Sequence, residues 1–192
     1  MTSVTSPLIE LLSADDEGLA QVARQEPAAF AELYHRHFAR VYRYHVARTG
    51  SIVEAQDLTT LTFLAAMEGI ASYRGSGTFV AWLMGIAHNQ MAQHFRSHRQ
   101  EQPLEQAESL SDTALLPEMM AGRRIEFAQV CQALGEIRPE RAEAITLCLF
   151  ANLTAREAGH VMGKSEGAIK MLMLRGLGEL REMLSAAQVE EV

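Results

Sequence analysis

The stretch TAREAGHVMGKSEGAIKMLMLRGLGELREML at residues 154–184 contains a short helical pattern, a tight turn and a longer helical pattern. Thr154 and Glu157 have the spacing of a capping box, which predicts the start of the first helix. Gly163 can end this helix, and Ser165 can cap the helix that follows. A short helix, a tight turn and a longer helix in this order predict a helix-turn-helix.

The second helix of this motif divides into two faces. Its apolar residues recur at helical spacing and are expected to face the domain core: Ile169, Leu172, Met173, Gly176 and Leu177. The residues expected to project outward are Lys170, Met171, Leu174 and Arg175. In the major groove, cations bind phosphates or guanine and apolar side chains contact thymine methyls. The same pattern is also typical of a helical hairpin with a solvated last helix, so this segment alone leaves both readings open.

Three further helices are predicted in the first half of the chain. Residues 30–42 carry apolar side chains at helical spacing, and Gly50 can end this helix. Residues 51–70 begin with capping-box spacing and should form a second helix that packs on the first as a hairpin. After a turn-rich segment at 73–78, residues 80–95 form a third apolar stripe. Because no segment alternates convincingly as a strand, the expected fold class is all-α.

Residues 100–119 separate the two halves. This segment is rich in Gln, Glu, Ser and Asp, contains two prolines and loses the helical period, which is typical of a linker. Helical periodicity resumes near Arg123, and Pro139 stands where another helix can begin. We therefore expect two small helical domains, at residues 1–99 and 120–192, that fold separately and are joined by a flexible linker.

Charge is unevenly distributed along the 192 residues, whose formal net charge is −7. Residues 1–27 and 101–122 together hold ten acids and one base. Residues 28–100 hold seven arginines against four acids, with six of the seven histidines, and residues 123–192 are nearly neutral. A basic module therefore lies between acidic flanks, which keeps nucleic acid open as a partner.

The apolar pattern argues against other classes of protein. No run approaches the length of a membrane span, and no basic residue precedes the short apolar run at residues 8–12, so neither membrane insertion nor secretion is expected. Cys131 and Cys148 stand in apolar helical patterns without a partner at metal spacing. We expect buried thiols in a cytoplasmic protein.

The candidates for catalysis and metal binding do not form a constellation. His94 and His98 have the i, i+4 spacing of metal ligands, but the glutamate of an HExxH motif is absent. The Gly-Ser-Gly segment at residues 75–77 is too short for a phosphate loop, and Asp57 has no carboxylate partner nearby in sequence. The residues therefore predict no reaction, no metal and no cofactor.

The central basic helix suits single-stranded nucleic acid. It carries Trp82, His88, Asn89, Gln90 and His94 next to the turn-rich segment at residues 73–78. Aromatic and polar side chains of this kind engage unstacked bases. A lone tryptophan in such a helix is more often part of a core, and composition does not separate the two readings.

Together these residues resemble a known family. The segments that carry the resemblance are residues 16–24, 27–34, 55–64, 79–89, 134–141 and 163–172. The first four are similar to conserved region 2 of the bacterial extracytoplasmic-function (group IV) RNA polymerase sigma factors, and the last two to region 4. Both sets stand in the family's order, separated by a linker of the expected kind.

The resemblance implies a transcription initiation subunit without catalysis of its own. Region 2 of the family docks on the clamp helices of the β′ subunit of core RNA polymerase, here through the helix bearing Asp57, Leu58, Thr62 and Phe63. It also captures the melted non-template strand of the minus-10 element. The matching candidates here are Tyr73, Arg74, Ser76, Thr78, Trp82, His88, Asn89, His94, Arg96 and Arg99.

Region 4 of the family sits on the β flap and reads the minus-35 element of duplex promoter DNA. The matching candidates are Ser165, Lys170, Met171, Leu174 and Arg175. In this family the linker passes through the polymerase cleft, where acidic residues could mimic nucleic acid: Glu101, Glu105 and Glu108.

The chain departs from the family pattern at several positions. Leu61 stands where the family often has Glu, and His88 where Arg is frequent, which implies altered docking and phosphate contacts. Met173 and Leu174 replace a polar or basic pair, so half of the outward face is apolar. Either this face reads thymine methyls, or a protein partner such as an anti-sigma factor covers it.

Three hypotheses follow. The first is an alternative sigma factor that directs promoter-specific initiation. The runner-up is a helix-turn-helix regulator or polymerase-binding protein without initiating activity, and the third is a helical interaction protein that binds no nucleic acid. Binding to core polymerase separates the first two from the third, and promoter-directed transcription separates the first from the second.

Overall fold

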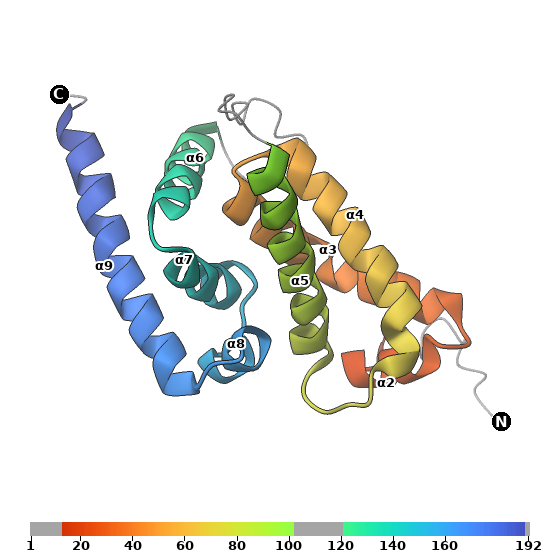
Figure 1. Cartoon of the computed structure of the whole chain (residues 1–192). Helices are drawn as coiled ribbons and strands as arrows, with labels where there is room; N and C mark the ends of the chain where they lie inside the picture. The colour runs from red at the N-terminus through yellow and green to blue at the C-terminus, as the bar shows by residue number, and fades with distance from the viewer. Residues whose placement is uncertain (1–12, 102–120, 191–192) are drawn as a thin grey trace.

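The computed structural model describes residues 13–101 and 121–190, and every regular element within these ranges is helical (Figure 1). The first group is α2 (Asp16–Val22), α3 (Pro27–Thr49), α4 (Ile52–Gly69), the 3-10 turn η1 (Ile70–Ser72) and α5 (Phe79–Glu101). The second is α6 (Ala121–Glu136), α7 (Pro139–Ile145), the π-helical turn η2 (Thr146–Phe150), α8 (Ala155–Met162) and α9 (Glu166–Glu190). We call these groups the N-terminal unit and the C-terminal unit. The all-α prediction is confirmed, and most of the predicted linker lies outside the described residues.

The helix ends follow the sequence signals. Gly50 adopts the left-handed conformation after α3 with φ of 67°, which an L side chain rarely adopts. The Ser51 hydroxyl accepts a hydrogen bond from the backbone N–H of Glu54 at the start of α4. Thr154 and Glu157 form the predicted reciprocal capping box at the start of α8. These local contacts explain why the helix boundaries could be predicted.

The N-terminal unit is a bundle around the α3–α4 hairpin, with α5 packed against both helices and α2 against α3 and α5. Its centre is formed by buried side chains from all four helices, among them Leu19, Leu33, Val41, Phe63, Leu83 and Met84. Polar contacts fix α2 on this bundle. The Asp16 carboxylate lies 2.8 Å from Nε2 of His37, and Glu17 accepts from the backbone N–H of Phe79.

The C-terminal unit places α9 against α6, α7 and α8. Leu134, Ile145 and Leu180 are buried where α6, α7 and α9 meet. Gly176 allows the close approach of α9 to α7, because a Cβ atom at this position would lie 2.7 Å from Cδ1 of Ile145. The cost of a glycine within this helix is therefore offset by packing.

The two units pack against each other. Helix α3 contacts α6 and η2, and α5 contacts α8 (Figure 1). One hydrophobic cluster contains both Tyr44 and Leu147, and another contains both Ala47 and Ile145. We expected separately folding domains, but the described residues share a core across the two units. The domain boundaries themselves stay a prediction.

His45 is fully buried within the N-terminal unit. Its Nε2 lies 3.0 Å from the Thr62 hydroxyl, which itself donates to the backbone carbonyl of Leu58. The hydroxyl therefore accepts from His45, and the ring is neutral with its proton on Nε2. Nδ1 has no partner among the described residues. Burial lowers the pKa of His45 to about 3.

This buried histidine predicts acid sensitivity. The folded pKa of His45 lies below the usual 6.5, so the unfolded chain binds more protons between pH 6.5 and about 3. Stability that is fully present above pH 6.5 is therefore lost as the pH falls, by about 1.4 kcal/mol per pH unit from this group. Urea unfolding at pH 7.5 and 5.5 measures the loss.

The controls for this prediction are two glutamine variants. His45→Gln should reduce the difference in unfolding free energy between pH 7.5 and 5.5, whereas His35→Gln, at an exposed position, should keep it. Equal pH dependence in wild type and His45→Gln would contradict the prediction.

Candidate nucleic-acid interface

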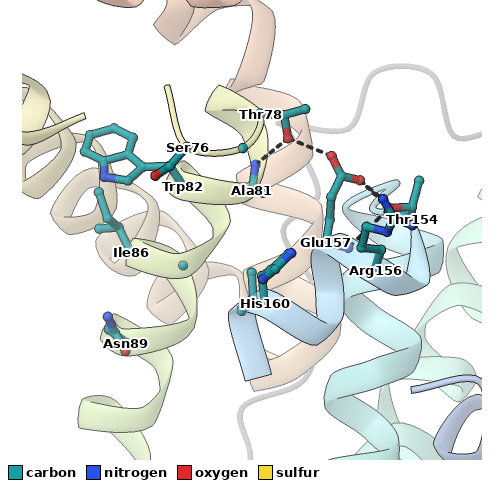
Figure 2. A pocket seen from close by; sticks show the side chains of 13 residues that line it. Ser76, Thr78, Ala81, Trp82, Ile86, Asn89, Thr154, Arg156, Glu157 and His160 are labelled. Atoms are coloured by element: carbon teal, nitrogen blue, oxygen red, sulfur yellow. Dashed lines mark hydrogen bonds between the residues drawn. The ribbon is translucent and has the colours of Figure 1, made fainter. Parts of the chain in front are cut away.

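A cleft of about 610 Å³ lies between the two units (Figure 2). One wall comes from α5 and the loop before it, and the other from α8. The lining residues that Figure 2 labels are Ser76, Thr78, Ala81, Trp82, Ile86, Asn89, Thr154, Arg156, Glu157 and His160. Four of the residues predicted to contact the minus-10 element, Ser76, Thr78, Trp82 and Asn89, therefore line one cleft.

Trp82 is held in place by an aromatic cluster. Its ring lies 5.5 Å, centroid to centroid, from both Tyr73 and Phe79. Trp82 is half-buried, so it packs in the core and also lines the cleft. Its contact with single-stranded nucleic acid stays a prediction. A ring fixed in this way suits stacking against a base.

The loop before α5 is ordered by a few specific contacts. Gly75 and Gly77 have φ of 72° and 109°, which explains the glycines of this turn. The hydroxyl of the buried Tyr73 donates to the carbonyl of Gly77, so Tyr73 supports the loop from beneath and does not face a ligand. Arg74 is exposed beside it.

Thr78 connects this loop to the C-terminal unit. Its hydroxyl accepts from the backbone N–H of Ala81 and donates to Glu157 at 2.6 Å. Burial opposes ionisation of Glu157, yet the hydrogen bonds from Thr78 and Thr154 lower its pKa. An ionised carboxylate thus lies at the edge of the cleft.

The remaining minus-10 candidates lie further along α5. His88 turns away from the cleft, and its Nδ1 lies 2.7 Å from Oε1 of Glu143. His94 lies 3.3 Å from Oε2 of Glu54, and Arg96 is exposed. The side chains of Arg99 and His98 lie outside the described residues, so the predicted surface is only partly gathered at the cleft.

The predicted polymerase-binding residues on α4 need correction. Leu58, Thr62 and Phe63 are buried in the core, because they face α3 and α5. They therefore cannot contact a docking partner directly in this structure. Asp57 is exposed. The same outer face of α4 carries exposed Leu61, which the sequence singled out only as a departure from the family pattern. It also carries three exposed apolar side chains that the sequence did not select: Val53, Leu64 and Met67.

The predicted recognition helix is α9. Lys170, Met171, Leu174 and Arg175 are exposed as predicted, and Leu174 is the most exposed of the large apolar side chains described, at 67%. The hydroxyl of Ser165 accepts from the backbone N–H of Ala168 and so caps this helix. Leu177 is 40% exposed, so its predicted place in the core was wrong.

The sequence missed Glu143, whose partners Tyr44 and His88 lie 99 and 55 positions away, so no local signal marks it. It marked Glu157 as part of a capping box but did not indicate its contact with Thr78, 79 positions away. Within the described ranges, no group of three metal-binding side chains is present, and no helix is long and apolar enough to cross a membrane. Cys131 is buried, which raises its pKa to about 12, and Cys148 is partly buried.

Comparison with known proteins identifies both units. Residues 33–101 match Sigma-70 region 2, and residues 133–182 match Sigma-70, region 4. The chain is 36% identical over 162 residues to the ECF RNA polymerase sigma factor BldN of Streptomyces coelicolor, which covers 83% of this chain and 61% of that protein. It is 30% identical over 178 residues to the RNA polymerase sigma factor CnrH of Cupriavidus metallidurans. The aligned part is 87% of this chain and 92% of that protein.

A solved structure shares the fold. The structure of CnrH in complex with the cytosolic domain of CnrY superposes with a TM-score of 0.70 over 90% of this chain and 97% of that chain, at 24% identity. The chain spans about three fifths of BldN but nearly all of CnrH. The order of the two matched regions, the relatives and the fold agree, and the chain belongs to the extracytoplasmic-function RNA polymerase sigma factors of the sigma-70 family.

Proposed function

We propose that this protein is an alternative sigma factor that binds core RNA polymerase and directs promoter-specific initiation. The observation that carries this proposal is that one chain contains both matched regions. The region 2 match has a cleft lined by Trp82, and the region 4 match has an exposed face on its recognition helix α9. We place it in group IV and in the cytoplasm, with no catalysis and no cofactor of its own.

Region 2 would capture the melted minus-10 strand at the cleft beside α5. Trp82 offers a ring for stacking, while Ser76, Thr78 and Asn89 offer polar groups to an extruded base. Exposed Arg74 and Arg96 would contact phosphates. We assign Tyr73 a supporting role beneath the loop.

The outer face of α4 would dock on the β′ clamp helices. An exposed stripe of Val53, Leu61, Leu64 and Met67 beside Asp57 provides apolar area with a charge at its edge. Exposed apolar patches of this kind mark protein–protein contacts. We therefore replace the buried Leu58, Thr62 and Phe63 in the proposed contact set by this stripe.

Helix α9 would read the minus-35 duplex, with region 4 seated on the β flap. Arg175 and Lys170 supply positive charge, although Lys170 lies 2.6 Å from Glu166 one turn earlier. Met171 and Leu174 supply apolar surface for thymine methyls. A regulator of the anti-sigma class is the alternative occupant of this apolar face.

Run-off transcription with purified core polymerase and a promoter template tests the proposal. We expect a transcript that depends on both this protein and the promoter, with core polymerase alone as the control. Core binding without a promoter-dependent transcript would favour the polymerase-binding regulator instead.

Two variants of α9 should change the binding of duplex DNA in different ways. If Arg175 contacts a phosphate, Arg175→Ala weakens binding to all sequences and lowers the salt slope by about one. If it reads a guanine, the loss is confined to one base pair at about 1–3 kcal/mol. Leu174→Ala should keep the salt slope and reduce the preference for a thymine-containing minus-35 element. If neither variant changes transcription, α9 does not read DNA.

A further inference from the structure

Glu143 is a buried acid at the contact between the two units. It lies on α7, and its side chain is only 7% exposed. Its three polar partners all belong to the N-terminal unit. The Tyr44 hydroxyl donates to Oε1 at 2.7 Å, His88 Nδ1 lies 2.7 Å from the same oxygen, and Arg48 Nε lies 3.0 Å from Oε2.

We call the packing of the two units against each other the closed arrangement. The Glu143 carboxylate depends on this arrangement for its polar partners, because all three come from the N-terminal unit. Burial by itself would raise the pKa of Glu143, but the hydrogen bond with His88 and the charge of Arg48 more than offset it, so the pKa is lowered. Arg48 is also buried, and its Nε makes an ion pair with Glu143 without an aligned hydrogen bond. A buried charge that loses its partner is strongly unfavourable, so loss of either residue should destabilise the contact.

The surrounding interface is not tightly filled. A cavity of about 270 Å³ lies beside this cluster, between α5 and the C-terminal unit, and is lined by Arg48, His88, Glu143 and Lys164 among others. The apolar part of the contact includes the small side chains of Ala47 and Ala142, which belong to one cluster. Separation would expose the apolar side chains that the two units share, such as Tyr44 and Leu147. Side chains packed inside one unit, such as Leu83 or Leu134, would stay buried.

The closed arrangement also places an obstacle at the cleft. Helix α8 lines the same cleft as Trp82 and Asn89, and Glu157 accepts a hydrogen bond from the hydroxyl of Thr78 (Figure 2). An ionised carboxylate at this edge repels the phosphates of an incoming strand. The surface proposed for the minus-10 strand is therefore partly covered by the C-terminal unit.

We propose that Glu143, with Arg48 and Tyr44, is a latch that closes the C-terminal unit over the single-strand-binding surface of α5 and keeps the free protein autoinhibited. The latch concerns the arrangement of the two units, and only the identity of the covered surface rests on the proposed function. Opening exchanges the contacts of Glu143 for water and uncovers Trp82.

Small-angle scattering on the free full-length protein tests the latch. Wild type should have a radius of gyration near the ~16 Å of a compact chain of this length. Glu143→Gln and, from the opposite side, Arg48→Gln should each increase it by several ångströms, and the double variant no further than the singles, because both remove one interaction. Glu140→Gln is the matched control, since Glu140 is exposed on the same helix and pairs with Lys164 within its own unit.

Trp82 provides a second readout, because it is the only tryptophan in the sequence. Acrylamide should quench its fluorescence more strongly in Glu143→Gln than in wild type or Glu140→Gln. A mixed-sequence single-stranded oligodeoxynucleotide of about ten nucleotides, within the usual range of binding-site sizes, should bind the latch variant at least several-fold more tightly.

The possible outcomes distinguish failure of the latch from failure of the proposed function. An expanded wild type, or latch variants as compact as wild type, would overturn the latch. Expanded variants with unchanged oligonucleotide affinity would overturn the autoinhibition. If the variants expand but neither they nor wild type bind the oligonucleotide, the latch stands and the minus-10 assignment of the cleft is overturned.

Discussion

We expect Gly159→Ala to destabilise the protein by about 1–3 kcal/mol, the usual cost of forcing an extra group into a packed site. Gly159 is buried in α8, and a Cβ at this position would lie 2.6 Å from the backbone oxygen of Lys164. This oxygen belongs to the turn that joins α8 to α9, so the turn must move. Thermal unfolding followed by circular dichroism measures the effect, at roughly 2–4 °C per kcal/mol for a chain of this size.

The same substitution in α9 provides the control for this prediction. A Cβ atom at Gly178 would meet no other atom of the described residues within 4 Å, so Gly178→Ala should gain helix propensity and stabilise by up to about 1 kcal/mol. The two variants should therefore shift the melting temperature in opposite directions. Because the turn sets the position of α9, Gly159→Ala should also weaken duplex binding. A stabilised Gly159→Ala would contradict the close approach of α8 to this turn.

We expect Leu61→Arg to weaken binding to core polymerase on the order of 10- to 100-fold, the equivalent of the roughly 1.5–3 kcal/mol from burying a leucine. Leu61 is 47% exposed on the outer face of α4, within the apolar stripe proposed for docking. Its replacement removes that apolar contact and introduces a charge that must be desolvated. Affinity is measured by fluorescence anisotropy with labelled sigma factor.

Two comparisons make this prediction specific. Asp57→Arg, one turn away on the same face, should also lower the affinity. Val22→Arg changes a similarly exposed apolar residue on α2 and should leave it unchanged. All three variants should melt within a few degrees of wild type, because exposed positions contribute little to stability. Unchanged affinity for both α4 variants would place the polymerase contact elsewhere.

The helices and their ends were predictable because local contacts determine them. Gly50 and Gly163 end helices in the left-handed conformation, and Thr154 with Glu157 starts α8 through bonds three residues apart. The outward residues of α9 also follow from helical spacing, apart from Leu177. A helix with one buried stripe can be read in this way from a single sequence.

Helix α4 shows where this reading fails. Motif resemblance selected Leu58, Thr62 and Phe63 as contacts, but motif positions do not say which side of a helix meets its neighbours. Only the packing of α3 and α5 against α4 turned these residues inward and left Leu61 and Leu64 outside.

Sequence alone determined the all-helical architecture and the order short helix, turn, longer helix at the C-terminal end, because these depend on spacing within short segments. The family was indicated by the resemblance of the motifs to known ones. The tertiary structure alone decided that the two units close on each other and that His45 and Glu143 are buried. Glu143 is 99 positions from Tyr44 and 55 from His88, and no local pattern encodes a contact between such distant residues. The physical reason is that burial of a polar side chain depends on the partners that folding brings to it, whereas a helix depends mainly on its own neighbours in the chain.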